Sequence, residues 1–313
     1  MSRSLPLVSI GMPAYNGSAT LEEAITSLLS QDYPNIELII SDDGSQDETF
    51  DLCSRFAASD RRIRLVRHLQ NCGAYANFND VFHLAGGDYF MWSAQDDRWH
   101  PHFIRRCVEQ LRRNDDAALC YSHMQPIAPD GTSLGAPLTD LAVDNADVVV
   151  RWRRVLEDWR LNACVYGVMR RDVAARTKLL RIRLAADVMF VAQMVLYGRV
   201  LQVPEVLHFK RRPVRLSDYR SWREMLDYVG GAGQRVPRML RRQVMRELLL
   251  AVDASPHSPR IRQRLARTCW QVYFRRGYWH HDLKESLRSL IGPSRYDRVI
   301  GPVKRFKHLG AWS

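Results

Sequence analysis

The sequence predicts an α/β fold, in which a mostly parallel sheet lies between two layers of helices, and three observations support this. Short apolar segments alternate with segments of helical periodicity over the first hundred residues. Each apolar segment is continuous rather than alternating, which is typical of a strand buried on both faces. Conspicuous polar residues follow the apolar segments, at the strand ends where parallel sheets bind ligands.

The elements are expected in the order β-α-β-α-β-α-β. Strands are predicted at residues 7–12, 36–41, 63–67 and 88–93, with Pro13 ending the first of them. The intervening helices are predicted to begin at Ser18 or Thr20, at about residue 49 and at about residue 77. Further along, helices are expected at about 102–113, 148–159 and 187–197, and strands at 117–122, 165–169 and 200–209. Parallel neighbours of this kind are joined by right-handed crossovers.

Length and charge indicate a large domain with an appendage. The chain has 313 residues, 46% of them hydrophobic and 26% charged, which is ordinary for a globular protein. We expect one domain over residues 1–217 and a basic helical region over 218–313. The first 97 residues carry 6 Lys and Arg against 14 Asp and Glu, a net charge of −8, and the remainder carries +20. An acidic first third suits cations, whereas a basic remainder suits phosphates, an anionic membrane surface or nucleic acid.

Cysteine usage and the N-terminal sequence favour the cytoplasm. The six cysteines are scattered, with no C-x-x-C pair and no spacing typical of zinc ligands. We therefore expect reduced thiols. The first residues lack the apolar stretch of a signal peptide, and no segment approaches the roughly 20 apolar residues of a membrane span.

Two pairs of adjacent carboxylates lie at predicted strand ends. Asp42 and Asp43 precede Gly44, so they could contact a ligand or simply form a turn. Asp96 and Asp97 would repel one another unless a cation shared their charge, and Mg²⁺ and Mn²⁺ prefer such oxygen ligands. The alternative for this second pair is a helix N-cap ahead of Pro101.

Two later features could also carry chemistry. Asp187 begins a predicted helix, where it could act as a general base toward a hydroxyl or serve only as an N-cap. Arg211 and Arg212 belong to a basic loop suited to phosphate, or to a solvated surface. His208, just before that loop, is a weaker candidate metal ligand.

Three common enzyme classes are excluded by their missing motifs. The chain has no G-x-x-x-x-G-K-[ST] of a P-loop enzyme and no G-x-G-x-x-G after the first strand, as a dinucleotide dehydrogenase would have. It also lacks the G-x-S-x-G of an α/β-hydrolase.

Taken in order, the motifs resemble those of the inverting family 2 glycosyltransferases. The resemblance is carried by VSIGMPAYNG at 8–17, LLSQDYP at 28–34, ELIISDDGS at 37–45, NCG at 71–73, AGGDYF at 85–90 and the Asp96-Asp97 pair. It covers about the first 110 residues closely and extends loosely to about residue 217. It implies a GT-A fold, which is Rossmann-like, and a nucleotide-sugar donor used with Mn²⁺ or Mg²⁺.

The resemblance also implies roles for individual residues. Pro13, Ala14 and Tyr15 would line the pocket of the nucleotide base, and Asp43 would hold the edge of that base, with uracil favoured. Asp96 would contact the ribose and Asp97 would bind the metal. Asp187 would be the catalytic base, and the loop of Arg211 and Arg212 would close over the donor.

This chain departs from the family pattern at two positions. Ala94 stands where many members have a third aspartate, and Ala186 stands before Asp187 where many have glutamate. Both departures weaken the transfer of substrate specificity from other members.

The basic C-terminal region suggests where the acceptor is found. Residues 235–250 predict a cationic amphipathic helix, and residues 296–312 add further cations and Trp312. We expect this region to lie on an anionic membrane surface, near a saccharide or lipid-linked saccharide acceptor, as in the assembly of cell-surface polysaccharide or glycolipid. The alternative is a helical bundle with a solvated basic face. Two other functions are a catalytically inactive GT-A binding module and a nucleic-acid-binding protein; no nucleic-acid motif supports the latter.

Overall fold

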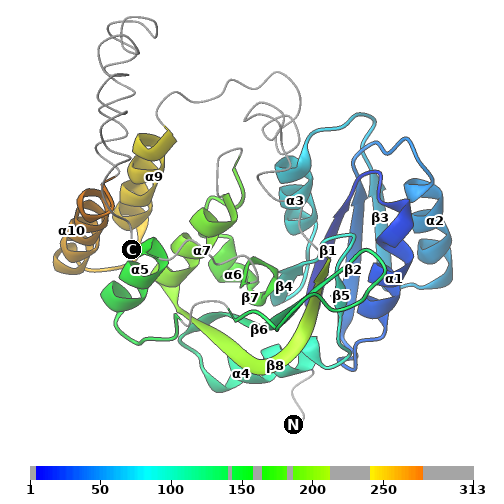
Figure 1. Cartoon of the computed structure of the whole chain (residues 1–313), viewed down its shortest axis with the longest axis horizontal. Coiled ribbons are helices and arrows are strands. Elements are labelled where there is room, and N and C mark those ends of the chain that lie inside the picture. Colours follow the sequence, from blue (N-terminus) through cyan, green and yellow to red (C-terminus); the bar gives the residue numbers. More distant parts are fainter. Residues whose placement is uncertain (1–4, 140–142, 158–163, 182–185, 212–239, 278–313) are drawn as a thin grey trace, which may run out of the picture.

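The computed structural model describes residues 5–139, 143–157, 164–181, 186–211 and 240–277, and all structural statements concern these ranges. Their strands form one eight-stranded sheet in the order β3-β2-β1-β4-β7-β6-β8-β5. Helices cover both faces of the sheet (Figure 1). The predicted three-layer, mostly parallel α/β architecture is therefore confirmed.

The first half of the sheet is entirely parallel. It consists of β1 (Val8–Ala14), β2 (Ile36–Asp42), β3 (Ile63–Arg67) and β4 (Tyr89–Trp92). The expectation that Pro13 ends the first strand is wrong, because Pro13 lies within β1 opposite Ser41. Strand β4 pairs with β1 only as far as Gly11, so the end of β1 has one unpaired side. A proline there removes no hydrogen bond from the ladder.

Helices of the first half pack on opposite faces of this sheet. Leu21 of α1 (Ser18–Leu29), Cys53 of α2 (Thr49–Ser59) and Phe103 of α4 (Phe103–Arg113) belong to one core. Helix α3 (Ala74–His83) contributes Val81 to the core on the other face. Helix α3 begins three residues before its predicted start, directly after Gly73, whose φ of 90° suits glycine.

The second half of the sheet is mixed. Strand β7 (Val168–Arg170) runs antiparallel to both β4 and β6 (Ala117–Ile127), whereas β6 and β8 (Arg199–Arg211) are parallel. The two-residue strand β5 (Arg98–Trp99) pairs antiparallel with β8 and was not predicted. Both β6 and β8 are longer than predicted, since they pair along most of their length.

The remaining helices build a layer on the α3 face. They are α5 (Val148–Glu157), a 3-10 turn (Cys164–Tyr166), α6 (Arg171–Ala174), α7 (Ala186–Tyr197), α9 (Leu240–Ala254) and α10 (Pro259–Arg275). Helices α9 and α10 share a core with α5 and α7, to which they contribute Leu248 and Leu265. The boundary predicted between residues 217 and 218 lies outside the described residues, so it stays a prediction.

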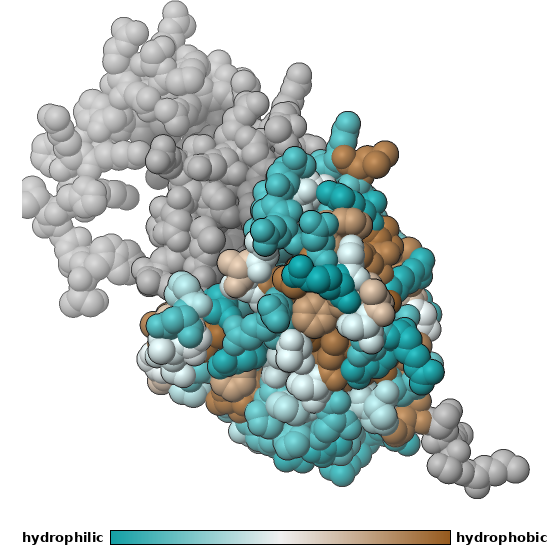
Figure 2. Space-filling view, turned by 90° about the vertical axis from the view of Figure 1, so that its right-hand side faces the viewer, coloured by the Kyte–Doolittle hydropathy of each residue, from teal (hydrophilic) through white to brown (hydrophobic). Residues whose placement is uncertain are grey.

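The molecule has two contrasting ends. Helices α1 and α2 lie at the β3 edge of the sheet, and α9 and α10 lie at the opposite end (Figure 1). The face seen from the β3 edge is largely hydrophilic, with hydrophobic side chains interspersed (Figure 2). Across the described residues, no helix is both long and apolar enough to span a membrane.

Candidate functional site

The site is built where three neighbouring parallel strands end. Strand β1 lies between β2 and β4, so all three carboxyl ends meet at one edge of the sheet. Ala14 is in register with Asp42, and its carbonyl oxygen accepts a hydrogen bond of 2.8 Å from the Asp43 amide. The predicted carboxylate clusters are therefore brought to the same edge, as parallel topology requires.

Asp43 is buried and fixed by the loop that precedes α3. Its Oδ1 accepts the Cys72 amide at 2.7 Å and the Cys72 thiol at 3.0 Å, and its Oδ2 accepts the Gly73 amide at 3.1 Å. The residue is only 1% exposed. Its carboxylate thus has a set orientation, and Oδ2 keeps a lone pair for a further donor.

Asp42 supports the turn rather than an open surface. It is fully buried, and its Oδ2 lies 3.2 Å from Arg67 Nε and 3.3 Å from the Ser45 amide. The Arg67 guanidinium also stacks over Phe50 at 4.1 Å. Arginine therefore neutralises this aspartate from within the protein.

Gln95 fixes the segment that follows β1, and sequence reasoning assigned it no role. Its side-chain amide accepts from the Tyr15 backbone N–H at 2.9 Å and donates to the Tyr15 carbonyl at 3.0 Å. A Cβ at Gly17 would lie 2.3 Å from that amide, so a larger residue there would displace the Gln95 side chain. Pro13 and Ala14 are buried, whereas Tyr15 is 40% exposed and available to a ligand. The only sequence clue to Gln95 is its position beside the Asp96-Asp97 pair.

Asp97 is held between two parts of β8. Its Oδ2 lies 2.8 Å from His208 Nε2, and its Oδ1 accepts the Arg211 amide at 3.1 Å. Both Asp97 and His208 are nearly inaccessible, and the imidazole stacks on Trp99 at 4.1 Å. The weakly predicted His208 is thus brought against the candidate metal ligand.

The burial of Asp96 beside Asp97 affects the pKa of the Asp96 carboxyl. Burial, followed by the neighbouring Asp97 charge, raises the pKa of Asp96 to about 6, although Lys210 and Arg211 act in the opposite direction. The protein therefore leaves negative charge at this strand end incompletely compensated. Carboxylate oxygens such as those of Asp96 and Asp97 are the ligand type that Mn²⁺ and Mg²⁺ prefer.

Arg211 lies in a different place from the one predicted. It is the last residue of β8 rather than part of a loop, and it is buried. Its guanidinium donates to the Asp96 carbonyl at 2.9 Å, to the carbonyls of Ala128 and Pro129, and to the Glu23 carboxylate. The loop placement is therefore wrong for Arg211, because strand pairing with β6 continues through it. Arg212 lies outside the described residues.

Asp187 sits in the first turn of α7, which an aromatic contact ties to β4. The ring of Phe190 meets the ring of Trp92 edge-on, with 4.9 Å between centroids. Trp92 ends β4 shortly before Asp96, and its indole donates to the Phe78 carbonyl at 2.7 Å. The helix of the predicted base is therefore positioned by the same strand that delivers Asp96 and Asp97.

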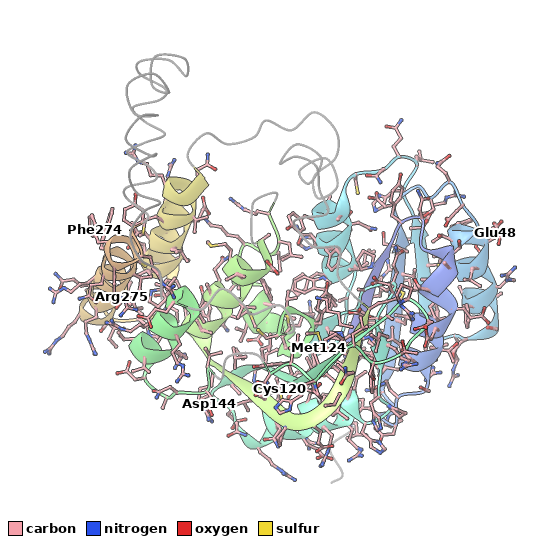
Figure 3. The ribbon with its side chains drawn as sticks, viewed as in Figure 1. Glu48, Cys120, Met124, Asp144, Phe274 and Arg275 are labelled. Atoms are coloured by element: carbon pink, nitrogen blue, oxygen red, sulfur yellow. The ribbon has the colours of Figure 1, made fainter. Side chains whose placement is uncertain are left out.

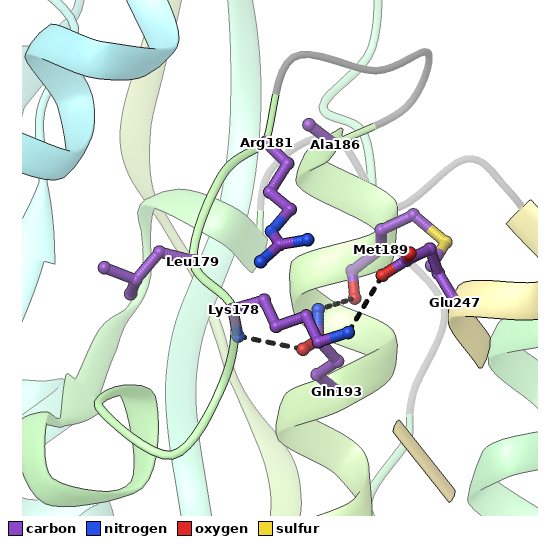
Figure 4. Close-up of a pocket in the computed structure, with 7 residues that line it drawn as sticks. All are labelled: Lys178, Leu179, Arg181, Ala186, Met189, Gln193 and Glu247. Atoms are coloured by element: carbon purple, nitrogen blue, oxygen red, sulfur yellow. Dashed lines mark hydrogen bonds and ion pairs between the residues drawn. The ribbon is translucent and has the colours of Figure 1, made fainter. Parts of the chain in front are cut away.

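A small pocket lies beside the start of α7 (Figure 4). It is lined by residues of the segment before α7, of α7 and of α9: Lys178, Leu179, Arg181, Ala186, Met189, Gln193 and Glu247. Lys178 pairs with Glu247 at 3.1 Å, and its amide donates to Gln193 at 2.9 Å. Ala186, which precedes Asp187, is one of the residues that line the pocket.

Comparisons with known proteins agree with this geometry. Residues 9–154 match the family described as glycosyl transferase family 2. The putative teichuronic acid biosynthesis glycosyltransferase TuaG of Bacillus subtilis is 32% identical over 134 residues, which are 43% of this chain and 53% of TuaG. The chain spans about a third to a half of the length of the curated relatives it matches.

Solved structures share the fold over most of the chain. S. aureus TarS 1–349 in complex with UDP-GlcNAc superposes with a TM-score of 0.62 at 14% identity, covering 86% of this chain and 72% of TarS. The Pyrobaculum calidifontis mannosyltransferase PcManGT, in complex with GDP-Man and Mn²⁺, gives 0.53 at 14% identity, covering 96% of this chain and 80% of PcManGT. The chain thus resembles glycosyl transferase family 2 over residues 9–154, where its motifs are joined at one edge of a GT-A-type sheet.

Proposed function

We propose that the protein transfers a sugar from a nucleotide-diphosphate sugar, with UDP favoured, to a hydroxyl acceptor, and that the anomeric configuration is inverted. The single observation that carries this proposal is the meeting of three strand ends, where Tyr15, Asp43 and Asp96 lie at one edge of the sheet. Relatives with roles in polysaccharide biosynthesis, such as TuaG, support an acceptor in cell-surface glycan or glycolipid assembly.

We assign the residues at the strand ends to parts of the nucleotide-sugar donor. Asp43 would accept a hydrogen bond from the base, with Pro13, Ala14 and Tyr15 as the wall of its pocket. Asp96 would contact the ribose. UDP is favoured because TarS binds UDP-GlcNAc, and the GDP-Man complex of PcManGT makes GDP the nucleotide to compare.

A divalent cation would be held by Asp97, beside Asp96. When bound, Mn²⁺ or Mg²⁺ supplies positive charge that offsets the charge developing on the nucleoside diphosphate. The buried cluster of Asp97 and His208 supports this assignment, since the imidazole adds a nitrogen donor to the carboxylates. Arg211 and Arg212 remain candidates for diphosphate contact. The buried guanidinium of Arg211, which is bound to four protein groups, favours a positioning role for it.

Asp187 would serve as the base. Its carboxylate would remove the proton of an acceptor hydroxyl while that oxygen forms a bond to the anomeric carbon. The bond from that carbon to the diphosphate oxygen breaks at the same time, on the opposite face. The carboxylate is partly buried and makes no hydrogen bond to another described residue, so it is free to take this proton.

The test begins with donor binding. A panel of nucleotide sugars with Mn²⁺ is measured by thermal unfolding, because a ligand that binds only the folded state raises its stability. We expect UDP-sugars to raise the Tm most. A larger rise in Tm with GDP- or dTDP-sugars would replace UDP as the nucleotide of the proposed donor. No rise in Tm with any donor would favour a catalytically inactive binding module.

Catalysis is tested with Asp187→Asn. We expect kcat to fall by about 10²–10⁴-fold, with donor binding unchanged, because only the positioned base is lost. Asp172→Asn is the matched control, since Asp172 is an exposed carboxylate on α6 that pairs with Arg176. Full turnover of Asp187→Asn would exclude the role as base.

We further propose that α10 contacts the inner face of the cell membrane. Arg267, Trp270 and Phe274 follow one face of this helix, where Trp270 is 45% and Phe274 is 55% exposed. Phe274 and Arg275 lie at the end of the molecule opposite Glu48, the residue before α2 (Figure 3). Exposed aromatic rings among arginines suit an anionic lipid surface. Of the predicted cationic helix at 235–250, residues from Leu240 onward form α9; 235–239 and 296–312 lie outside the described residues.

Vesicle co-sedimentation tests the membrane contact. We expect binding to vesicles that contain anionic lipid, and weaker binding of a Trp270→Ser, Phe274→Ser double variant. Vesicles of neutral lipid are the control. Equal binding of the double variant and the parent protein would remove α10 from the contact.

A further inference from the structure

A second cluster of potential metal ligands lies beside Asp43, away from the Asp96-Asp97 pair. The ligand atoms of Asp43, His68 and Cys72 all lie within 4.8 Å of one another. We propose that these three side chains form a binding site for a soft divalent cation, of which Zn²⁺ is the type.

The side chains are already oriented toward one another. The Cys72 thiol is 3.0 Å from Asp43 Oδ1. His68 Nε2 is shielded from solvent and makes no hydrogen bond; it lies 3.3 Å from Asp80 Oδ2. An enclosed ring nitrogen without a hydrogen bond is costly to bury, and a cation would satisfy it. The Asp80 carboxylate beside the same nitrogen adds negative charge that favours a cation there.

The backbone holds the ligands in place from both sides. The His68 amide donates to the Asp42 carbonyl at 2.8 Å, which fixes the chain as it leaves β3. The amides of Cys72 and Gly73 donate to Asp43, and Asn71 Oδ1 accepts the Gly73 amide at 2.9 Å. Little ordering is therefore needed when a cation binds, which favours affinity.

The donor set selects the class of ion. Thiolate and imidazole ligands suit Zn²⁺, with a carboxylate as a common third ligand. Mg²⁺ and Mn²⁺ prefer sites made mainly of oxygen, such as that of Asp96 and Asp97. The two clusters would therefore bind different ions.

Binding is coupled to proton release. Burial, together with hydrogen bonding and charge from Asp43, raises the pKa of the Cys72 thiol to about 12, so the thiol is protonated at neutral pH. When the cation binds, a sulfur–metal bond replaces the S–H bond and one proton passes to solvent. Affinity should consequently rise with pH.

A consequence for activity follows, and it rests on the proposed function. Asp43 is the residue proposed to hold the nucleotide base, so the soft cation and the donor would use the same carboxylate. Zn²⁺ should then compete with the donor, although it would leave the Asp96-Asp97 cation in place.

Cobalt provides a direct measurement, because Co²⁺ bound to a thiolate absorbs in the near-ultraviolet. Protein without a histidine tag is titrated with CoCl₂ and then with ZnCl₂. We expect a charge-transfer band at one equivalent of Co²⁺, which Zn²⁺ removes and excess Mn²⁺ does not. Cys72→Ser should abolish the band and His68→Gln should weaken it. Cys269→Ala should retain it, since Cys269 lies in α10, far from the site.

The outcomes distinguish the metal site itself from its competition with the donor. Absence of the band at pH 8, or a band that survives in Cys72→Ser, overturns the site. If the site exists, Zn²⁺ at ten times its Kd should raise the apparent Kd of UDP about tenfold, by simple competition. UDP binding that ignores Zn²⁺ would leave the metal site standing and contradict the role of Asp43 in base binding.

Discussion

The two carboxylate pairs at this sheet edge have opposite electrostatic surroundings. At the end of β2, Asp42 is paired with Arg67, and Asp43 accepts backbone amides from Cys72 and Gly73. At the end of β4, Asp97 contacts His208 and the Arg211 amide, and Asp96 has a pKa raised to about 6. In the first pair Asp42 has a cationic partner and Asp43 is held by neutral donors, whereas in the second pair the crowding of the two carboxylates raises the pKa of Asp96.

The two pairs are similar in sequence but have different surroundings in the folded protein. Both pairs follow a buried strand, and both are Asp-Asp. Their partners come from elsewhere in the chain, so only the folded geometry distinguishes them.

Replacing Asp97 tests the β4 pair most strongly. Asp97→Asn should lower transfer by at least about 100-fold, because a preorganised charge acting on the diphosphate is lost. Mn²⁺ binding, measured by electron paramagnetic resonance, should weaken in parallel. Asp43→Asn is the comparison, and it should impair donor binding while Mn²⁺ still binds. Wild-type Mn²⁺ affinity in Asp97→Asn would erase the contrast between the pairs.

The raised pKa of Asp96 predicts a pH dependence. The negative charge of Asp96 attracts the cation proposed at its neighbour Asp97, so Mn²⁺ affinity should fall by up to about tenfold per pH unit below pH 6, as Asp96 takes up a proton. In cation-free protein, the stability of the fold changes with pH in the opposite direction. Folded Asp96 keeps its proton up to about pH 6, so its stabilisation is full at low pH and is lost as the pH rises toward 6. Calorimetric titrations of the parent protein and Asp96→Asn between pH 5 and 8 check the first effect. If Mn²⁺ affinity depends on pH in the same way in both proteins, Asp96 is not the group responsible.

Removing Arg67 should destabilise the folded protein, because Asp42 of the β2 pair loses its ion-pair partner. Arg67→Gln leaves the buried Asp42 without its cation and should lower the free energy of unfolding by about 1 kcal/mol. Urea unfolding gives the measurement, and Arg61→Gln, at an exposed site without an ion pair, is the control. If both variants unfold alike, Arg67 does not stabilise Asp42.

The smallest effect is expected at Gln95, which joins the segment after β4 to the segment after β1. Gln95→Ala removes both hydrogen bonds to Tyr15, so KM for the donor should rise about threefold while kcat changes little. Gln263→Ala, at an exposed position of α10, is the control. A change in kcat alone would point to a role nearer the reaction.

The first half of the fold could be predicted because its determinants are local. Strands β2 and β3 and helix α2 occupy nearly the predicted residues, since continuous apolar segments and turn residues fix them. Strand β1 continued past Pro13 because its neighbour β4 ends earlier, which depends on pairing. For the same reason β5 was missed: two residues become a strand only through β8.

The site was predictable in its residues but not in its contacts. Asp43, Asp96 and Asp97 were found from their positions after strands. The contact of Asp97 with His208 joins residues 111 apart, and no local pattern encodes it. Arg211 shows the limit most clearly, because its sequence neighbours suggest a basic loop whereas pairing with β6 buries it in a strand.

The edge-on contact between Trp92 and Phe190 has a consequence for the geometry of the proposed reaction. It lies in the core, yet it sets how far the helix of Asp187 stands from the strand of Asp97. With the roles proposed for Asp187 and Asp97, this core contact would fix the spacing between the leaving group and the incoming oxygen.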